Sequence, residues 1–247
     1  MADYGAEFYG DRHRRTVHAA RAILAVVREV LPPIRSAVDL GCGVGTWLSV
    51  LAEDGVEEIL GLDGDWVARD LLEIPPSAFL EADLSAPVRL GRRFDLAISL
   101  EVAEHLPARS AETFVASLAG LSDFILFSAA VPFQGGVQHV NEQWPDYWAE
   151  RFRREGYAPW DSIRHRVWDD HDIPVWYRQN VVLFVRRERV GELRVRSIDV
   201  AEASASLSRL HPELFQVMVN DWHSVRGSSR LLGRAVRRWV RHRLGRK

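Results

Sequence analysis

The sequence of 247 residues contains a single cysteine, Cys42. One thiol cannot form an intramolecular disulfide bond, and it excludes a structural zinc site built from several cysteines. We therefore expect a protein of a reducing compartment, here the cytoplasm. No stretch approaches the roughly 20 consecutive apolar residues of a membrane-spanning helix. The first residues, MADYGAEFYGDRHRR, lack the apolar segment of a secretory signal peptide, so we expect none there.

Acidic residues are missing from the end of the chain. Residues 226–247 contain nine Lys and Arg and no Asp or Glu, which leaves 23 basic and 34 acidic side chains in residues 1–225, a net charge of −11. Nucleic-acid binding needs an excess of positive charge, so the acidic body argues against a nucleic-acid partner. The basic end has apolar residues every three to four positions. This pattern predicts an amphipathic helix that contacts a membrane surface or packs on its own domain.

Short apolar runs alternate with helix-length segments over most of the chain. Near-continuous apolar runs predict strands that are buried on both faces. They lie at residues 37–41, 58–63, 78–84, 94–102, 124–131 and 180–186. The alternation predicts an α/β fold with a doubly wound, mostly parallel sheet. We expect three parts: an N-terminal helical lid over 1–34, a central domain over 35–187 and a C-terminal helical appendage over 188–247.

The first predicted strand ends in a loop with three glycines, VDLGCGVGTW, at residues 38–47. Gly41, Gly43 and Gly45 let a ligand approach the backbone closely, at the sheet edge where ligands bind in such folds. The helix after the loop presents free N–H groups to an anionic part of that ligand. A tight turn without a ligand is the alternative for this loop taken alone.

Acidic residues at the next two strand ends complete a nucleoside site. Asp63 ends the second strand, where a carboxylate accepts hydrogen bonds from both hydroxyls of a ribose. Asp83 ends the third strand, where it or the backbone beside it can bind an adenine amino group. With the D-x-G-x-G-x-G spacing that begins at Asp39, these motifs resemble the class I S-adenosylmethionine-dependent methyltransferases over residues 35–186.

The resemblance implies a Rossmann-like sheet of seven strands whose last strand, here residues 180–186, is antiparallel. It also implies that Asp39 and the Gly41–Gly45 loop hold the amino-acid end of the cofactor, Asp63 its ribose and Asp83 its adenine. A nicotinamide dehydrogenase fits poorly because it needs a different glycine spacing. A non-catalytic cofactor-binding module is a further alternative, but Asp63 and the glycines are intact.

The segment FDLAISLEVAEHLP, residues 94–107, places further polar groups at the fourth strand end. On a helical turn, Glu101, Glu104 and His105 share one face, where we expect them to lie beside the donated methyl group. Two carboxylates and an imidazole can bind a divalent cation such as Mg²⁺. His139, after the fifth strand, is the expected fourth ligand. Without a metal, His139 is the expected general base, and Glu101 only contacts the cofactor.

This E-x-x-E-H pattern with a distant histidine resembles the metal-dependent small-RNA 2′-O-methyltransferases. The E-x-x-E-H part alone also resembles the ubiquinone-pathway O-methyltransferases. Both resemblances imply a cation that binds neighbouring substrate oxygens and makes the attacking hydroxyl more acidic. A neutral hydroxyl is a poor nucleophile, so such a reaction benefits from a Lewis acid or a general base. The expected catalytic residues are Glu104, His105 and His139.

Aromatic residues are concentrated in the second half, where seven of the nine tryptophans lie at or beyond position 144. Tryptophan faces beside polar groups suit the apolar faces and hydroxyls of sugars. The expected substrate contacts are Asn141, Glu142, Trp144, His171 and Trp176. By contrast, we expect Tyr147, Trp148 and Phe152 to form the core face of a helix. The HVNEQWP run resembles the actinobacterial methyltransferases of methylmannose polysaccharide synthesis.

The sequence therefore predicts an S-adenosylmethionine-dependent O-methyltransferase that acts on a sugar hydroxyl of a glycan or glycosylated metabolite. A divalent cation and a histidine base are expected to assist it. Methylation of an RNA ribose, or of a small molecule such as a quinone or a polyketide phenol, is the alternative. The sequence identifies neither the acceptor hydroxyl nor the oligomeric state.

Overall fold

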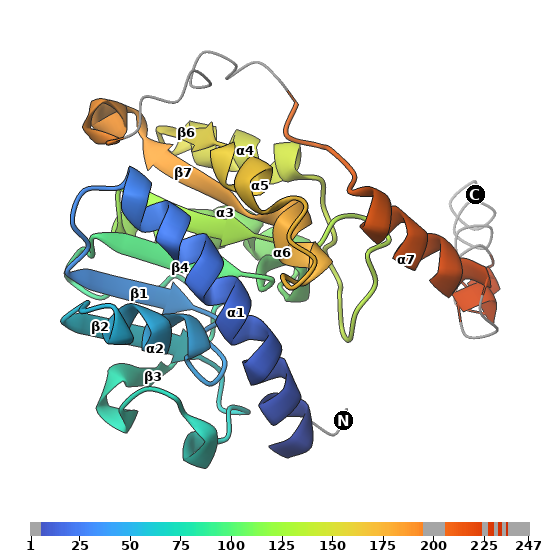
Figure 1. Cartoon of the computed structure of the whole chain (residues 1–247), viewed down its shortest axis with the longest axis horizontal. Coiled ribbons are helices and arrows are strands. Elements are labelled where there is room, and N and C mark those ends of the chain that lie inside the picture. The colour runs from blue at the N-terminus through green and yellow to red at the C-terminus, as the bar shows by residue number, and fades with distance from the viewer. Residues whose placement is uncertain (1–5, 195–205, 224–226, 230–231, 234–235, 237–247) are drawn as a thin grey trace, which may run out of the picture. The chain divides into compact units, whose positions relative to one another are not determined.

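The computed structural model describes residues 6–194, 206–223, 227–229, 232–233 and 236 (Figure 1). The chain divides into two compact units, Met1–Arg209 and Leu210–Lys247. The domain boundary expected between residues 187 and 188 stays a prediction. The second unit contains the helix α7 (Pro212–His223). Most of the basic amphipathic helix expected over 226–247 lies outside the described residues.

The first unit is an alternation of helices and strands. Its elements in chain order are α1 (Ala6–Val30), β1 (Ser36–Leu40), α2 (Thr46–Glu53), β2 (Glu58–Asp63), β3 (Phe79–Glu81), β4 (Leu96–Leu100), α3 (Ala111–Leu121), β5 (Phe124–Ser128), α4 (Pro145–Arg154), β6 (Tyr157–Trp160), α5 (Ser162–Val167), α6 (Val175–Asn180) and β7 (Val182–Arg186). Short 3₁₀ turns lie between them. Among the described residues, no helix combines the length and the apolar character needed to cross a bilayer.

The strands form one seven-stranded sheet in the order β3-β2-β1-β4-β5-β7-β6. All neighbouring strands from β3 to β5 pair in parallel, whereas β7 is antiparallel to both β5 and β6. This confirms the predicted doubly wound, Rossmann-like sheet with an antiparallel last strand. The strand β6 was not predicted, because Pro159 interrupts it. Proline is tolerated there because β6 is an edge strand, where one row of backbone groups has no partner strand.

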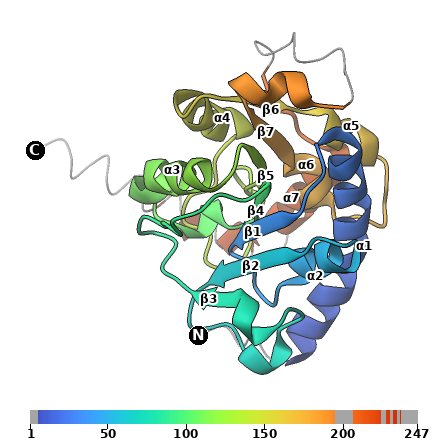
Figure 2. The same cartoon turned by 90° about the vertical axis from the view of Figure 1, so that its left-hand side faces the viewer.

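Side chains alternate between two apolar layers on the two faces of the sheet. Ala37 of β1 packs with α1, α2 and α5, whereas Val38, the next residue, packs with α3 and α4. Figure 2 shows these two sets of helices on opposite sides of the sheet. Trp148 and Phe152 are buried in the second layer and Tyr147 packs against it, which confirms the expected core face of α4.

The helix α1 is part of the core over its second half. Ala19, Ile23, Leu24 and Val27 are completely buried in the first apolar layer. The region expected as an N-terminal lid therefore includes a structural helix that covers one face of the sheet. Its burial follows from apolar residues at intervals of three and four, which place one face of the helix against the strands.

Candidate functional site

The candidate site lies at the edge of the sheet where the parallel strands end. There β1 leads into the glycine loop, β2 ends at Asp63, and β4 is followed by Glu101. The segment after β5 carries His139. In open α/β sheets this carboxyl edge is where ligands bind, beside the point at which the strand order reverses. That point lies between β1 and β4 in this sheet.

Glycine at position 41 lets the end of β4 approach the loop. Gly41 has φ +90°, and a Cβ atom there would lie 2.3 Å from a methyl carbon of Val102. An L side chain would therefore be strained by its backbone and would collide with the chain just after Glu101. At Gly43 a Cβ atom would meet no atom within 4 Å. The loop therefore packs tightly against the end of β4 at Gly41, whereas space remains around Gly43.

Asp63 joins the end of β2 to the glycine loop. Its carboxylate accepts hydrogen bonds from the N–H of Gly43 and the N–H of Gly64, each at 2.7 Å. Burial raises the pKa of Asp63, while these two N–H groups and the side chain of Trp66 act to lower it. Trp66 is 71% exposed and was not predicted. An aromatic residue three positions after a strand-end acid is the signal that could have identified it.

Two further groups are buried here: Asp39 in β1 and Cys42 within the glycine loop. Asp39 is only 2% exposed, and burial, followed by repulsion from Asp63, holds its pKa well above the usual range. Burial also raises the pKa of the Cys42 thiol, and the charges of Asp39 and Asp63 add to this effect. Both groups are therefore stabilised in their neutral forms, and Asp39 lies inside the strand rather than on the open side of the loop.

Asp83 lies two residues beyond β3 and is exposed. Its carboxylate accepts hydrogen bonds from the hydroxyl of Ser85 at 2.7 Å and from the N–H of Ser85 at 2.9 Å. These bonds hold the pKa of Asp83 below its usual value. The carboxylate is thus partly engaged in a local turn with Ser85.

Glu104, His105 and His139 form a compact cluster of possible metal ligands. One ligand atom from each lies within 4.8 Å of the others. The Glu104 side chain is completely buried, and its Oε1 lies 4.0 Å from Nε2 of His139. The rings of His105 and His139 meet edge to face, with centroids 4.8 Å apart. The structure thus brings together three of the four predicted ligands.

Main-chain bonds hold the His139 segment against the Glu104 turn. The carbonyl oxygen of Glu104 accepts hydrogen bonds from the N–H groups of Val140, at 2.9 Å, and Asn141, at 3.0 Å. Gly136, with φ +149°, allows the ring of His139 to pack closely, since a Cβ atom there would lie 2.2 Å from Nε2. The imidazole therefore has a defined place beside Glu104.

Glu142 orients His139 and closes the loop that carries it. Its carboxylate lies 3.2 Å from Nδ1 of His139 and accepts the N–H groups of Phe133 and Gly135 at 2.9 and 3.0 Å. Burial raises the pKa of Glu142, but His139 and these N–H groups outweigh it, so the pKa lies below its usual value. An ionised Glu142 favours the proton on Nδ1, which leaves a lone pair on Nε2 facing the cluster.

Glu101 does not join the metal cluster. Its carboxylate accepts a hydrogen bond from Nε2 of Gln134 at 2.8 Å and another from Nδ2 of Asn180 at 3.1 Å. Burial raises the pKa of Glu101, whereas Asn180, Gln134 and Ser128 oppose that shift. Glu101 is thus not one of the clustered metal ligands, because its carboxylate is bonded to the amides of Gln134 and Asn180. Sequence reasoning missed Gln134 and Asn180, which lack any motif.

The expected substrate residues fall into two groups. Asn141 is buried and accepts a hydrogen bond from Gln143, while Glu142 is engaged with the loop. Trp176 is half-buried against the core. Trp144, at 40% exposure, and His171 remain accessible to an acceptor. Three apolar residues near His139 are also exposed: Phe133, Val137 and Val140.

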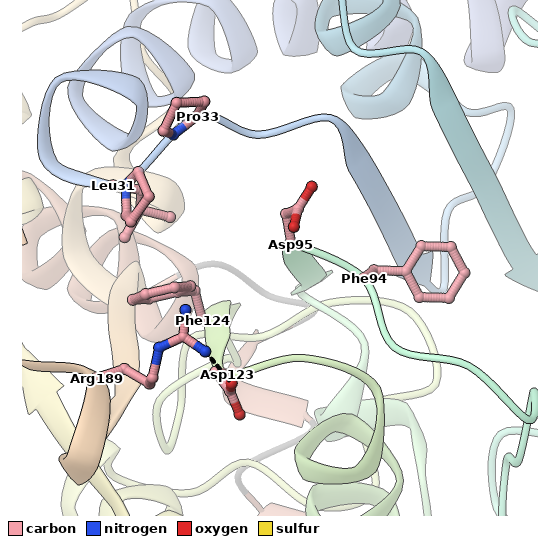
Figure 3. Close-up of a pocket in the computed structure, with 8 residues that line it drawn as sticks. Leu31, Pro33, Phe94, Asp95, Asp123, Phe124 and Arg189 are labelled. Carbon is pink, nitrogen blue, oxygen red and sulfur yellow. Dashed lines mark hydrogen bonds and ion pairs between the residues drawn. The ribbon is translucent and has the colours of Figure 1, made fainter. Parts of the chain in front are cut away.

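A small pocket at the opposite edge of the sheet has a structural character (Figure 3). It lies before β4 and at the start of β5, where Asp123 pairs with Arg189 at 3.1 Å. Asp95, in the same pocket, accepts the N–H groups of Arg35 and Ser36. Its charged groups therefore serve to join segments at the amino edge, away from the cluster of Glu104 and His139.

A family model described as a methyltransferase domain matches residues 11–167, which is more than half of the chain. No curated protein matches the chain. Among solved structures, magnesium protoporphyrin IX methyltransferase from Synechocystis PCC 6803 with bound S-adenosylmethionine is 21% identical. The similarity covers 70% of this chain and 79% of that chain, with a TM-score of 0.50.

A second similar structure is the methyltransferase domain of bacterial CtHen1-C. It is 20% identical, covers 69% of this chain and 98% of that chain, and has a TM-score of 0.51. A chain in the complex of the Haloferax volcanii Trm112 methyltransferase activator with a putative methyltransferase is 18% identical, with 75% and 95% coverage and a TM-score of 0.50. At these identities, the structures show a shared fold.

Proposed function

Because the chain belongs to the class I S-adenosylmethionine-dependent methyltransferases, we propose that it transfers the cofactor's methyl group to a sugar hydroxyl of a glycan or glycosylated metabolite. The observation that carries the choice of an oxygen acceptor is the cluster of Glu104, His105 and His139 beside the glycine loop. A hydroxyl needs help to lose its proton, and this cluster offers a base or the ligands of a Lewis acid.

The nucleoside end of the cofactor would be held by the residues at the ends of β1 and β2. Each oxygen of the Asp63 carboxylate accepts one backbone N–H and the Trp66 side chain adds a third bond, which leaves one lone pair for a ribose hydroxyl. The space around Gly43 leaves room for the methionine part of the cofactor. Asp83, or the backbone beside it, would bind the adenine.

The cluster fits a divalent cation. Glu104 offers an oxygen and the two histidines offer ring nitrogens, and Glu142 holds the Nδ1 of His139 so that Nε2 is the ligand atom. A set with two imidazoles suits a transition-metal ion such as Fe²⁺ or Zn²⁺ better than the Mg²⁺ suggested by the sequence, since Mg²⁺ prefers oxygen ligands. Such a cation would supply a Lewis acid that makes the acceptor hydroxyl more acidic.

The protein's own residues would orient the reaction and manage the proton. The buried Glu104 carboxylate and the Glu142 carboxylate both lie beside His139, so they would stabilise a positive charge on its ring. In the absence of a metal, Nε2 of His139 would take the proton from the acceptor hydroxyl. Glu101 would lie on the cofactor side, where alignment of the donor and the acceptor supplies much of the rate acceleration.

The accessible indole of Trp144 supports a sugar acceptor, because it offers an apolar face close to the His139 loop. A second candidate is a small molecule with an apolar part, such as a quinone or a phenol. It is favoured by the exposed Phe133, Val137 and Val140 on the same loop. RNA is disfavoured by the acidic charge of residues 1–225.

A methyl-transfer assay with labelled S-adenosylmethionine tests the proposal. The acceptor panel contains oligosaccharides, glycosylated metabolites, quinols, phenols and short RNAs, each with and without a chelator. We expect transfer to a saccharide, loss of transfer in chelator, and recovery with a divalent transition-metal ion such as Fe²⁺ or Zn²⁺. Transfer only to phenols or RNA would overturn the sugar proposal. Full activity in chelator would overturn the metal and leave His139 as the base.

A further inference from the structure

A second cluster of possible metal ligands lies between α1 and the loop before α6. One ligand atom each from His18, Asp170 and Asp172 lies within 4.8 Å of the others. His18 belongs to α1, whereas both aspartates lie in the loop between α5 and α6. This cluster shares no residue with the one beside the glycine loop. An imidazole and two carboxylates are nitrogen and oxygen donors of the kind that Zn²⁺ accepts in proteins.

The loop that carries the two aspartates is held in place on the protein. Ile173 is completely buried in the same apolar layer as Ala19 of α1. The buried guanidinium of Arg178 donates to the carbonyl oxygens of Trp168 and Ile173, at 3.0 and 2.8 Å. These two residues lie on either side of the acidic stretch. Binding of a cation therefore requires little further ordering of the loop, which lowers its entropic cost.

The helix on the other side of the cluster is also held in place. Figure 2 shows α5 beside α1, and an ion pair of Arg166 with Glu29, at 2.6 Å, joins the two helices. His18 lies about 16 Å from Glu29 along the axis of α1, toward its N-terminus. A cation at His18 would therefore be a second point of attachment between α1 and the segment that follows α5.

The distances within the cluster fit ligands of one cation better than an ion pair. Nε2 of His18 lies 3.6 Å from Oδ2 of Asp170, which is too long for a hydrogen bond. Two ligands of a tetrahedral zinc ion, each about 2.0 Å from the metal, are about 3.3 Å apart. The other oxygen of Asp170 accepts the N–H of Asp172 at 3.0 Å, which leaves Oδ2 to face the imidazole.

The charge of the cluster also favours a cation. In the part of the chain that the structure describes, neither Asp170 nor Asp172 forms an ion pair with an arginine or a lysine. Two carboxylates this close repel each other, and a shared cation turns that repulsion into attraction. The side chains of His18 and Asp170 are 52% and 37% exposed. Water can therefore reach the cluster and complete the coordination of a metal.

We propose that His18, Asp170 and Asp172 form a divalent-cation site, with Zn²⁺ as the preferred ion, that fastens α1 to the loop before α6. The imidazole supplies Nε2, each aspartate supplies one oxygen, and water supplies the remaining ligand. The site goes beyond the proposed function and does not depend on it. Its cation would also restrict the movement of His171, an expected substrate contact that lies between the two aspartates.

Isothermal titration calorimetry with Zn²⁺ alone tests the proposal, on the full chain without an affinity tag and freed of metal by a chelator. The readout is the number of ions bound per chain. We expect two in wild type, one here and one at the cluster of Glu104, His105 and His139. The variant His18→Ala should lose one of them. Because His18 is half-exposed, its replacement should leave the fold intact.

Asp172→Asn gives a second measurement at the same site. Partners outside a ligand set are already worth about 10 to 100-fold in metal affinity, so loss of this carboxylate should weaken the site at least tenfold. The matched control is His165→Ala, which removes an exposed histidine of α5 that contacts Arg209. It should bind the same number of ions as wild type.

An unchanged number of ions in His18→Ala would overturn the inference, and so would the absence of bound Zn²⁺ in wild type. Equal losses in His18→Ala and His165→Ala would overturn it too, because they would indicate unspecific binding to surface imidazoles. One ion in wild type and none in His18→Ala would support this site and count against a metal in the proposed function, so the two failures are distinguishable.

Discussion

The two halves of the site are built by different means. The proposed nucleoside half, made of Asp39, the Gly41–Gly45 loop and Asp63, is joined by hydrogen bonds from the N–H groups of Gly43 and Gly64 to Asp63. The proposed acceptor half, made of Glu104, His105 and the 131–142 loop, is held by side chains that bridge distant segments. We expect substitutions in the first half to change cofactor affinity and those in the second to change turnover.

The largest effect should come from His139. Replacing it in His139→Ala removes the Nε2 atom beside Glu104, so turnover should fall by about 10² to 10⁴-fold. Affinity for S-adenosylhomocysteine should stay unchanged, because His139 lies in the acceptor half. Initial rates and calorimetry measure the two quantities. His165→Ala, an exposed histidine of α5, is the control. A collapse of cofactor binding in His139→Ala would mean that the two halves are not separable.

Asp63 offers the complementary test in the nucleoside half. In Asp63→Asn the side chain loses its charge and keeps only one of the two oxygens that accept the Gly43 and Gly64 N–H groups, so affinity for the cofactor should fall by about 10 to 100-fold. Turnover at saturating cofactor should change much less. The exposed Asp65, changed to Asn, is a matched control two residues away. Equal losses in both variants would show that net charge, rather than the Asp63 geometry, governs affinity.

A pair of neighbouring glycines tests how closely the acceptor half is packed. Alanine at Gly136 would place a Cβ atom 2.2 Å from Nε2 of His139, whereas alanine at Gly135 would meet no atom within 4 Å. Both glycines have positive φ, so both variants should lose about 1–3 kcal/mol of stability. Only Gly136→Ala should also reduce turnover, by about tenfold or more. Thermal unfolding and initial rates separate the two effects; equal turnover in both variants would contradict the close packing.

The smallest effect concerns the segment after the acceptor half. Burial raises the pKa of Asp146, but hydrogen bonds from Ser206, Leu207 and Ser208 outweigh it and hold the pKa below its usual value. The folded state therefore binds fewer protons than the unfolded state. This stabilisation is present above the usual aspartate pKa of about 4 and is lost as the pH falls through the lower, folded value.

Asp146→Asn should accordingly lower the free energy of unfolding at neutral pH. Its difference from wild type should shrink on acidification, and urea unfolding at several pH values measures it. Asp169→Asn, an exposed acid in which the same bonds are not formed, provides the comparison. A difference that grows toward acid pH would reverse the sign and contradict the assignment.

The sequence could predict the sheet and the nucleoside half because their information is local. A buried strand, a glycine loop and an acid at the next strand end follow one another within about 25 residues, so their spacing fixes where they meet. The cluster of Glu104, His105 and His139 was also predictable, because the two segments follow neighbouring parallel strands. The cofactor-binding roles of Asp39, the Gly41–Gly45 loop, Asp63 and Asp83 stay predictions.

The features that the sequence did not predict depend on contacts between residues far apart in the chain, which no sequence motif indicates. Gln134 and Asn180 are 33 and 79 residues from Glu101, and amides occur throughout the chain, so nothing in the sequence marks these two. The same bonds explain why Glu101 does not lie with the other three predicted metal ligands. The edge strand β6 was missed because Pro159 argues against a strand unless its edge position is known. Trp66 was missed because its role depends on the position of Asp63.

The buried thiol of Cys42 has a practical consequence. The thiolate form of cysteine attacks alkylating reagents, and burial together with nearby acids disfavours that form here. Modification should therefore await an opening of the loop, and since no other cysteine competes, its rate counts those openings directly. A bound nucleoside should slow the alkylation of Cys42. The labelling rate could therefore report how much of the protein has cofactor bound, even when the acceptor is not known.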